Sequence, residues 1–308
     1  MQTDRSQCSR SAAIDQLSDR DAMSAMLTSH IDALEAARSA IADISAAGAL
    51  VARAVAAGGT VHYAAAGSSG LMALADACEL PGTFQIPPGQ IGIHMAGGVP
   101  TEGMMPGSTE DDREDAVRAA RAVDENDVAI VVSASGTTPY ALGFADAARA
   151  RGASVIGIAN AANTALLQAS DIAISLNTAP EVVEGSTRLA AGTAQKAALN
   201  MISTQVGVLL GHVHDGLMIN LNPDNIKLRQ RATHIVSRIA GVAADDADEA
   251  LRRTGYNAKL ATLVAAGADL SEAQALLARN NGHLRACLHH IIPKTKNQNT
   301  TSIQGRNQ

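Results

Sequence analysis

The sequence predicts an α/β fold in which a doubly wound parallel sheet carries helices on both faces. Short apolar runs rich in β-branched residues recur through the middle of the chain, and a helical pattern follows most of them. Continuous apolar runs of this length are typical of parallel strands that are buried on both faces. Turns rich in Gly, Ser and Thr separate the runs from the helices, as expected for crossover connections.

Five apolar runs are expected to form the sheet. Each is six or seven residues long and is bounded by turn residues, which favours a strand over a buried helix segment. The expected strands cover residues 60–66, 90–95, 127–132, 153–159 and 171–176.

Helical patterns flank this region. Between Asp21 and Ala57, apolar residues at steps of three, four and seven predict one helix or two helices in series, which Gly58-Gly59 ends. Long helical patterns also cover 190–210 and 227–240, and short ones follow. The expected organisation is a flexible N-terminal arm over 1–20, an α/β domain over 21–243, a small helical subdomain over 244–290 and a disordered tail over 291–308.

Composition excludes several kinds of partner. The chain has 308 residues with 30 acidic and 24 basic side chains, a formal charge of −6, and aromatic residues make up only 2%. An acidic, aromatic-poor chain lacks the basic surface and stacking platforms that nucleic-acid binding needs. No run approaches about 18 consecutive apolar residues, and the N-terminus lacks the apolar core of a signal peptide. We therefore expect a soluble cytoplasmic protein that binds no nucleic acid and no membrane.

Metal sites and disulfides are not expected. Cys8, Cys78 and Cys287 are far apart in the sequence and form no C-x-x-C pair. His212 and His214 have no third ligand nearby.

Two loops that follow expected strands are rich in hydroxyl groups and open helices. In open α/β sheets, ligands bind at the carboxyl ends of the strands. Backbone N–H groups at a helix start, with neighbouring hydroxyls, can hold a tetrahedral oxyanion. Neither loop carries the Lys of a Walker motif, and no G-x-G-x-x-G occurs, so a monophosphate on a small ligand is favoured over a nucleotide cofactor. The candidate residues are Ser68 and Ser69 in the first loop and Ser133, Ser135, Thr137 and Thr138 in the second.

A third cluster contains Ser186, Thr187 and Arg188, and its Arg is suited to pair with a phosphate or carboxylate. Two carboxylates also attract interest. Glu79 stands near a helix end just before Leu80-Pro81, and Glu110 precedes a helical pattern. Spacing alone leaves each of these glutamates equally compatible with an ordinary surface or helix-start role.

Several blocks between about residue 55 and 290 resemble the sugar isomerase (SIS) domain family and, within it, the N-acetylmuramic acid 6-phosphate etherases. The blocks occur in order over most of the chain. They are YAAAGSSG, DACELPGT, AGG at 96–98, TEDDRED, SASGTTPY, GSTRLAAGTAQK, DGLMINLNPDNIKLRQRA and NNGHLRACL.

This resemblance implies an SIS-type three-layer α/β/α fold with a small ubiquitin-associated-like helical subdomain. It also implies a homodimer with active sites near the subunit interface, and no metal or nucleotide cofactor. The reaction would cleave the lactyl ether at C3 of N-acetylmuramic acid 6-phosphate, giving N-acetylglucosamine 6-phosphate and D-lactate in cell-wall sugar recycling. Glu79 matches the position of the proton donor, and Glu110 matches the carboxylate taken as the base at C2.

Three positions depart from the family pattern. Leu71, Thr137 and Ala190 stand where the etherases carry basic residues. Their absence leaves open whether the substrate is 6-phosphorylated. Two other functions also stay open: a phosphosugar aldose–ketose isomerase, and a non-catalytic sugar-phosphate sensor similar to the glucokinase regulatory proteins, which share the GSTR…AGTAQK block.

Overall fold

A computed structural model describes residues 13–291, so most of the expected arm and tail lie outside the described residues. Contacts divide the described chain into two compact units. The first comprises residues 13–78 and 88–205, and the second comprises 79–87 and 206–291.

The first unit is built on a five-stranded parallel sheet with the order β2-β1-β3-β4-β5. All five expected strands are present, within one or two residues of their expected bounds. β1 and β3 are buried along their whole length, as continuous apolar runs predict. The strands are β1 (Val61–Ala65), β2 (Ile91–Met95), β3 (Val128–Ser133), β4 (Ser154–Ala159) and β5 (Ile172–Ser175).

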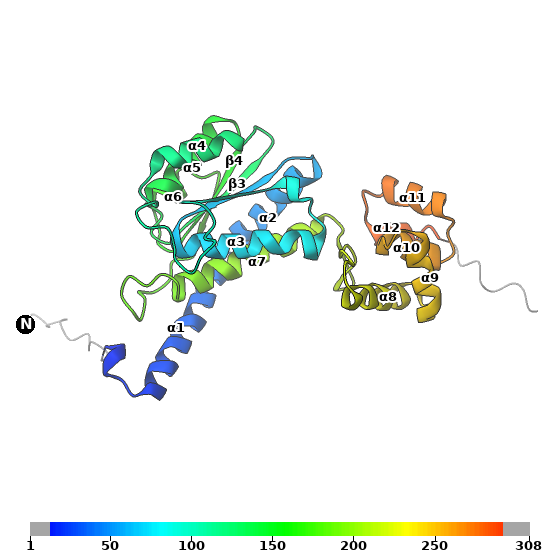
Figure 1. The fold of residues 1–308 in the computed structure, drawn as a ribbon, viewed down its shortest axis with the longest axis horizontal. Helices are drawn as coiled ribbons and strands as arrows, with labels where there is room; N and C mark the ends of the chain where they lie inside the picture. Colours follow the sequence, from blue (N-terminus) through cyan, green and yellow to red (C-terminus); the bar gives the residue numbers. More distant parts are fainter. Residues whose placement is uncertain (1–12, 292–308) are drawn as a thin grey trace, which may run out of the picture. The chain divides into compact units, whose positions relative to one another are not determined.

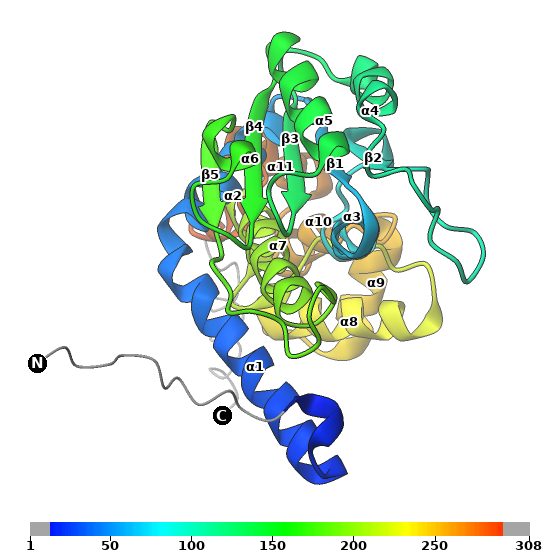
Figure 2. The same ribbon diagram turned by 90° about the vertical axis from the view of Figure 1, so that its left-hand side faces the viewer.

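Helices cover both faces of this sheet, which confirms the predicted fold class. Figure 1 shows α4, α5 and α6 on one face and α2, α3 and α7 on the other, and Figure 2 shows the same layers from the side. The helices are α1 (Asp19–Ser39), α2 (Ile41–Ala56), α3 (Gly67–Phe84), α4 (Arg113–Ala119), α5 (Pro139–Ala150), α6 (Ala165–Gln168) and α7 (Ala190–Leu209), with short 3₁₀ turns at Ile14–Gln16, Pro88–Gln90 and Ala120–Ala122.

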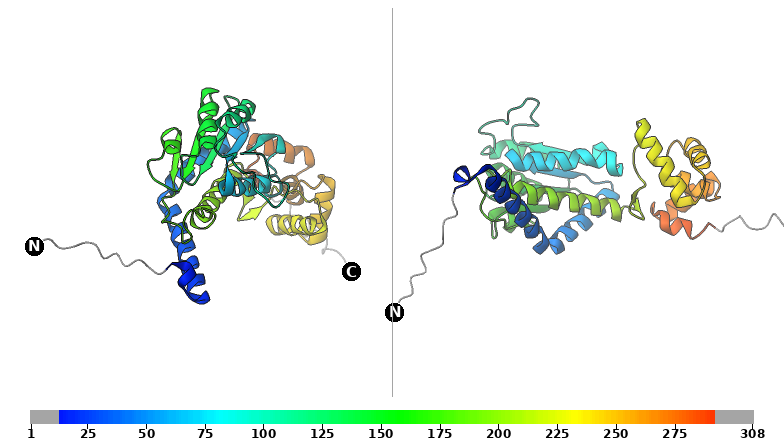
Figure 3. Two further views of the ribbon diagram at one scale, coloured as in Figure 1. Left: turned by 60° about the vertical axis from the view of Figure 1, so that its left-hand side comes forward. Right: turned by 90° about the horizontal axis from the view of Figure 1, so that it is seen from below.

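The N-terminal helical region forms two helices, α1 and α2, and α1 extends away from the sheet (Figure 3). The side chain of Ser18 caps α1 by accepting a hydrogen bond from the N–H of Asp21, so the helix begins slightly before the expected position. Among residues 13–291, no single helix is long and apolar enough to cross a membrane. Only α1 and α2 taken together reach that length and hydropathy, and they are bent by 67°.

The second unit contains a two-stranded hairpin and five helices around their own core. Leu251, Leu263 and Leu276 are among its buried side chains. This unit is larger than the subdomain expected over 244–290, because α8 buries Ile235 and Val236 in the same core. Its elements are β6 (Val213–His214), β7 (Leu217–Met218), α8 (Ile226–Ala240), α9 (Ala244–Arg253), α10 (Ala258–Ala265), α11 (Leu270–Arg279) and α12 (Leu284–Leu288).

Candidate functional site

The loop between β3 and α5 gathers four hydroxyl groups. Ser133 Oγ lies 2.8 Å from Thr138 Oγ1 and 3.5 Å from Ser135 Oγ. Thr137 Oγ1 donates to Ser135 Oγ at 3.0 Å. Thr138 is the N-cap residue of α5, yet its side chain makes no capping hydrogen bond. The hydroxyls therefore form a cluster of their own at the carboxyl end of β3, which helix capping alone does not explain.

Glu110 lies between the two hydroxyl-rich loops. Its carbonyl accepts a hydrogen bond of 3.0 Å from the N–H of Tyr140 in the first turn of α5. A Cβ placed on Gly67, at the start of α3, would lie 3.9 Å from Glu110 Oε2. Ser68 is half-buried and Ser69 is buried in the same first turn of α3. The structure thus brings Glu110 to both loops, although the sequence placed it in a separate segment.

The N-terminus of α7 holds a carboxylate from the chain itself. Glu181 accepts hydrogen bonds from the N–H groups of Ala190 at 2.8 Å and Ala191 at 2.9 Å. These are free donors at a helix start, where the helix dipole favours negative charge. Glu181 therefore closes the loop that carries Ser186, Thr187 and Arg188, and it carried no distinguishing signal in the sequence.

The same end of α7 lies beside α3 and β4. A Cβ on Gly192 would lie 4.0 Å from Met72 Cγ, so the first turn of α7 approaches the second turn of α3 closely. Asn160, which follows β4, lies 3.4 Å from the carbonyl of Ala191 through its amide nitrogen and accepts a 2.7 Å bond from Gln195. The sequence analysis did not single out Asn160, although its position directly after an expected strand was a usable signal.

Glu79 is exposed and lies further along α3. It follows Gly67 by 12 residues, which corresponds to about 18 Å of helix rise. Within one chain, then, α3 itself separates Glu79 from the end of the helix beside which Glu110 lies. The structure brings together Glu110 and the hydroxyls of the two loops, but it leaves Glu79 at a different level of α3.

Asp76 fixes α3 one turn before Glu79. It is 1% exposed and accepts hydrogen bonds from Tyr63 Oη at 3.0 Å, Asn200 Nδ2 at 2.8 Å and Ser203 Oγ at 2.9 Å. Burial raises the pKa of this carboxyl, and the three hydrogen bonds only partly oppose that effect. The network ties α3 to β1 and α7.

Metal ligands are not grouped in this structure. Within residues 13–291, no three His, Cys, Asp or Glu side chains lie where they could hold a metal ion. The prediction that the protein needs no cofactor stays a prediction.

Gly136 is required by the shape of the hydroxyl loop. Its φ is +65°, and a Cβ there would lie 2.2 Å from Thr164 Oγ1. We expect Gly136→Ala to lower the free energy of unfolding by about 2–4 kcal/mol, through left-handed backbone strain and displacement of Thr164, the N-cap of α6. Urea denaturation measures this change.

The matched control is Gly89→Ala. A Cβ at Gly89 meets nothing within 4 Å, so the change should be within about 0.5 kcal/mol. Equal stabilities of the two variants would show that the loop does not depend on Gly136.

Comparison with known proteins gives a consistent set of relatives. A family model for the SIS domain matches residues 26–160. An N-acetylmuramic acid 6-phosphate etherase from Streptomyces coelicolor is 40% identical over 90% of this chain and 90% of its own length. An etherase of the same name, numbered 2, from Bacillus licheniformis is 41% identical over 76% of this chain and 79% of its own length.

Solved structures include more distant neighbours. A phosphoheptose isomerase from Francisella tularensis matches with a TM-score of 0.45 and 18% identity, covering 63% of this chain and 98% of that one.

Proposed function

Because this chain belongs to the N-acetylmuramic acid 6-phosphate etherase family of SIS-domain proteins, we propose that it is a carbon–oxygen lyase that cleaves the C3 lactyl ether of that sugar phosphate or of a related amino sugar. The products are N-acetylglucosamine 6-phosphate and D-lactate. The role fits recycling of cell-wall amino sugars.

The first step requires a base at C2. A C3 ether does not leave unaided, but opening of the sugar ring gives an aldehyde at C1 that acidifies the C2 proton. Glu110 removes this proton to give an enolate of the C1 aldehyde, which can take a proton back from solvent. In the next step the electron pair forms the C2–C3 double bond as the C3–O bond breaks. Positioned proton transfer of this kind contributes about 10²–10⁴-fold to rate.

The second carboxyl group completes the elimination. Glu79 protonates the departing lactyl oxygen, so that this oxygen becomes the hydroxyl group of D-lactate. Water then adds to C3 of the unsaturated aldehyde, and a proton returns to C2, which restores the N-acetylglucosamine skeleton. The two carboxyl groups need different protonation states at the same pH, as paired acid and base groups do.

The placement of Glu110 carries this proposal. Its carboxylate is next to the start of α3, and its carbonyl is bound to the first turn of α5. A base there lies between two segments, the first turn of α5, which follows the loop with Ser133, Ser135, Thr137 and Thr138, and the first turn of α3, which carries Ser68 and Ser69. Neutral hydroxyl and N–H donors at two helix starts suit a phosphate or sugar oxygens, and Ser186, Thr187 and Arg188 are assigned to the same ligand.

We also propose a homodimer in which the partner subunit supplies Glu79 to the site of Glu110. The 12-residue separation of Glu79 from Gly67 along α3 supports a second chain as the source. An apolar stripe on α1 supports the same assembly, because its side chains occupy one helix face and are unusually exposed. The stripe consists of Met23 (59% exposed), Leu27 (61%), Ile31 (52%) and Leu34 (48%).

Release of D-lactate tests the proposed reaction. Purified protein is incubated with N-acetylmuramic acid 6-phosphate, and D-lactate and N-acetylglucosamine 6-phosphate are quantified. We expect equimolar release of both products. An isomerase or a non-catalytic sensor releases no lactate, so its absence with every substrate tested would overturn the lyase assignment.

The same assay with unphosphorylated N-acetylmuramic acid measures how much the phosphate contributes. Leu71, Thr137 and Ala190 supply no positive charge around the loops. Lactate from the unphosphorylated sugar alone would therefore assign the substrate to amino sugars without a phosphate. A phosphorylated substrate further supports a cytoplasmic enzyme, because a charged sugar does not cross the apolar interior of a membrane unaided.

A further inference from the structure

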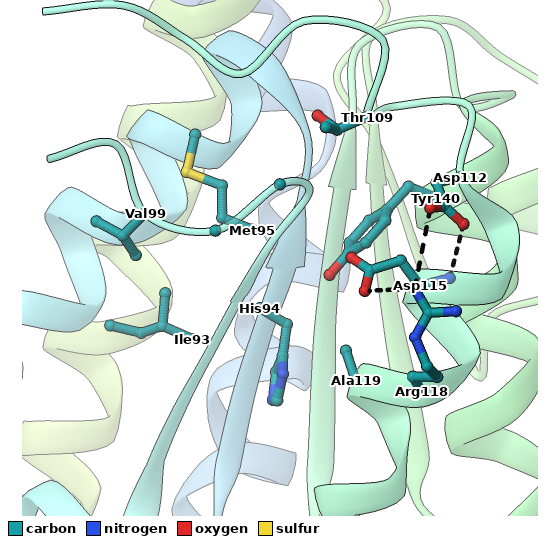
Figure 4. Close-up of a pocket in the computed structure, with 12 residues that line it drawn as sticks. Ile93, His94, Met95, Val99, Thr109, Asp112, Asp115, Arg118, Ala119 and Tyr140 are labelled. Atoms are coloured by element: carbon teal, nitrogen blue, oxygen red, sulfur yellow. Dashed lines mark hydrogen bonds and ion pairs between the residues drawn. The ribbon is translucent and has the colours of Figure 1, made fainter. Parts of the chain in front are cut away.

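A cavity lies between β2 and α4, on the α5 side of the sheet (Figure 4). It has a volume of about 520 Å³, within the range of small-molecule sites. None of the hydroxyl-bearing residues of the candidate site lines it. Its polar lining residues include His94, Asp112, Asp115, Arg118 and Tyr140.

His94 on β2 belongs to a hydrogen-bonded array with His62 on β1 and Asp127, which directly precedes β3. Asp127 Oδ2 lies 3.1 Å from His62 Nε2, and His62 Nδ1 lies 2.9 Å from His94 Nε2. Burial would raise the pKa of Asp127, but bonds from the N–H groups of Thr60 and Asp124 and from His62 outweigh it, so the pKa is lowered. Asp127 is therefore a carboxylate, and it accepts the Nε2–H of His62.

This array occupies one ring nitrogen of His94. Its Nε2 is paired with His62 Nδ1, which leaves Nδ1 as the ring nitrogen available to a ligand in the cavity. Burial, followed by the charge of His62, lowers the pKa of His94 to about 4, so its ring is neutral near pH 7. The ring of His94 therefore adds no positive charge to the cavity.

The charged groups in the cavity carry a net negative charge. Arg118 lies 3.1 Å from Asp115 and 4.0 Å from Asp112, so two carboxylates and one guanidinium leave a formal charge of −1. Burial, with the charges of Asp115 and Asp112, raises the pKa of Tyr140 to about 12, which keeps its phenol neutral. Tyr140 is 1% exposed, so its side chain is held firmly at the cavity wall.

We propose that this cavity is a binding site for a small monocationic molecule that carries an ammonium group and neighbouring hydroxyls. The ammonium balances the charge of Asp112, Asp115 and Arg118, and the hydroxyls, which can donate or accept, bond to His94 Nδ1 and Tyr140. Ile93 and Val99 provide an apolar wall for the carbon frame. Because Thr109 and Asp112 line the cavity and flank Glu110, the ligand contacts the segment that carries the proposed base.

A matched pair of sugars tests this site. Glucosamine carries a free amine, and N-acetylglucosamine has the same ring without the charge. We expect calorimetric titration at pH 6.5 to show glucosamine binding at least about tenfold more tightly, the effect of one lost charge-assisted contact. Equal binding of both sugars, or no binding of glucosamine, would overturn the proposal.

Two variants locate the binding. His94→Phe removes the hydrogen-bonding nitrogen but keeps a ring beside Phe144, and Asp115→Asn removes one charge while keeping the shape. Each should weaken glucosamine binding at least about fivefold. The control Asp146→Asn changes an exposed carboxylate on α5 that pairs with Arg113 outside the cavity, and should bind as the unaltered protein does. If Asp115→Asn and His94→Phe both bind glucosamine unchanged, the ligand lies elsewhere and the assignment is wrong.

Discussion

The Glu79→Gln variant is expected to lose D-lactate release by about 10²–10⁴-fold, because the departing lactyl oxygen then has no proton donor. Exchange of the C2 proton with solvent should persist, since Glu110 is unchanged. The two effects are measured together by incubating the substrate in D₂O, with lactate quantified enzymatically and C2 deuterium followed by NMR.

Glu110→Gln should behave differently. Removal of the base abolishes both lactate release and C2 exchange, because elimination starts with the C2 proton. Glu102→Gln is the matched control, an exposed glutamate in the segment that leads to Glu110 and outside the proposed site. Full ether cleavage by Glu79→Gln would show that Glu79 is not the acid. Retained C2 exchange in Glu110→Gln would show that Glu110 is not the base.

Mixing the two inactive variants is expected to restore activity. If the partner subunit supplies Glu79, a heterodimer of one Glu79→Gln chain and one Glu110→Gln chain contains one intact site and one doubly altered site. Random reassortment of equal amounts makes half of the dimers mixed, so activity should return to about 25% of that of the unaltered protein, as two-fold symmetry requires.

Each variant refolded alone provides the control, and it should stay inactive after the same unfolding and refolding treatment. If both glutamates of a site came from one chain, every site in the mixed dimer would lack one of them. No recovery, with mixed dimers shown to be present by differential tagging, would therefore contradict the shared site while leaving the single-variant results intact.

The strands and the hydroxyl-rich loops were predictable from sequence because their physical signals are local. β1 and β3 are continuous apolar runs, and Ser133 to Thr138 follow one of them directly. The meeting of Glu110 with Gly67 was not predictable in this way, because it depends on how the segment after the edge strand β2 folds back over the sheet.

Other features depend on side chains that are distant in sequence. In the sequence Glu181 resembles any loop glutamate. Only the structure shows that its carboxylate accepts hydrogen bonds from the first N–H groups of α7. His62 and His94 are 32 residues apart, and only the parallel register of β1 and β2 makes them neighbours. The packing of α8 with α9 and α10 is likewise a tertiary property that periodicity does not reveal.

The carboxylate of Glu181 makes the helix starts at the sheet's ligand-binding edge unequal. The start of α7 already has a covalently tethered counter-ion, whereas the loops before α3 and α5 carry hydroxyl and N–H donors, with Glu110 between them. An external anion therefore cannot use the N–H groups of Ala190 and Ala191 without displacing Glu181. On that side of the edge, a negative group of the sugar is expected to meet Arg188 rather than the helix start.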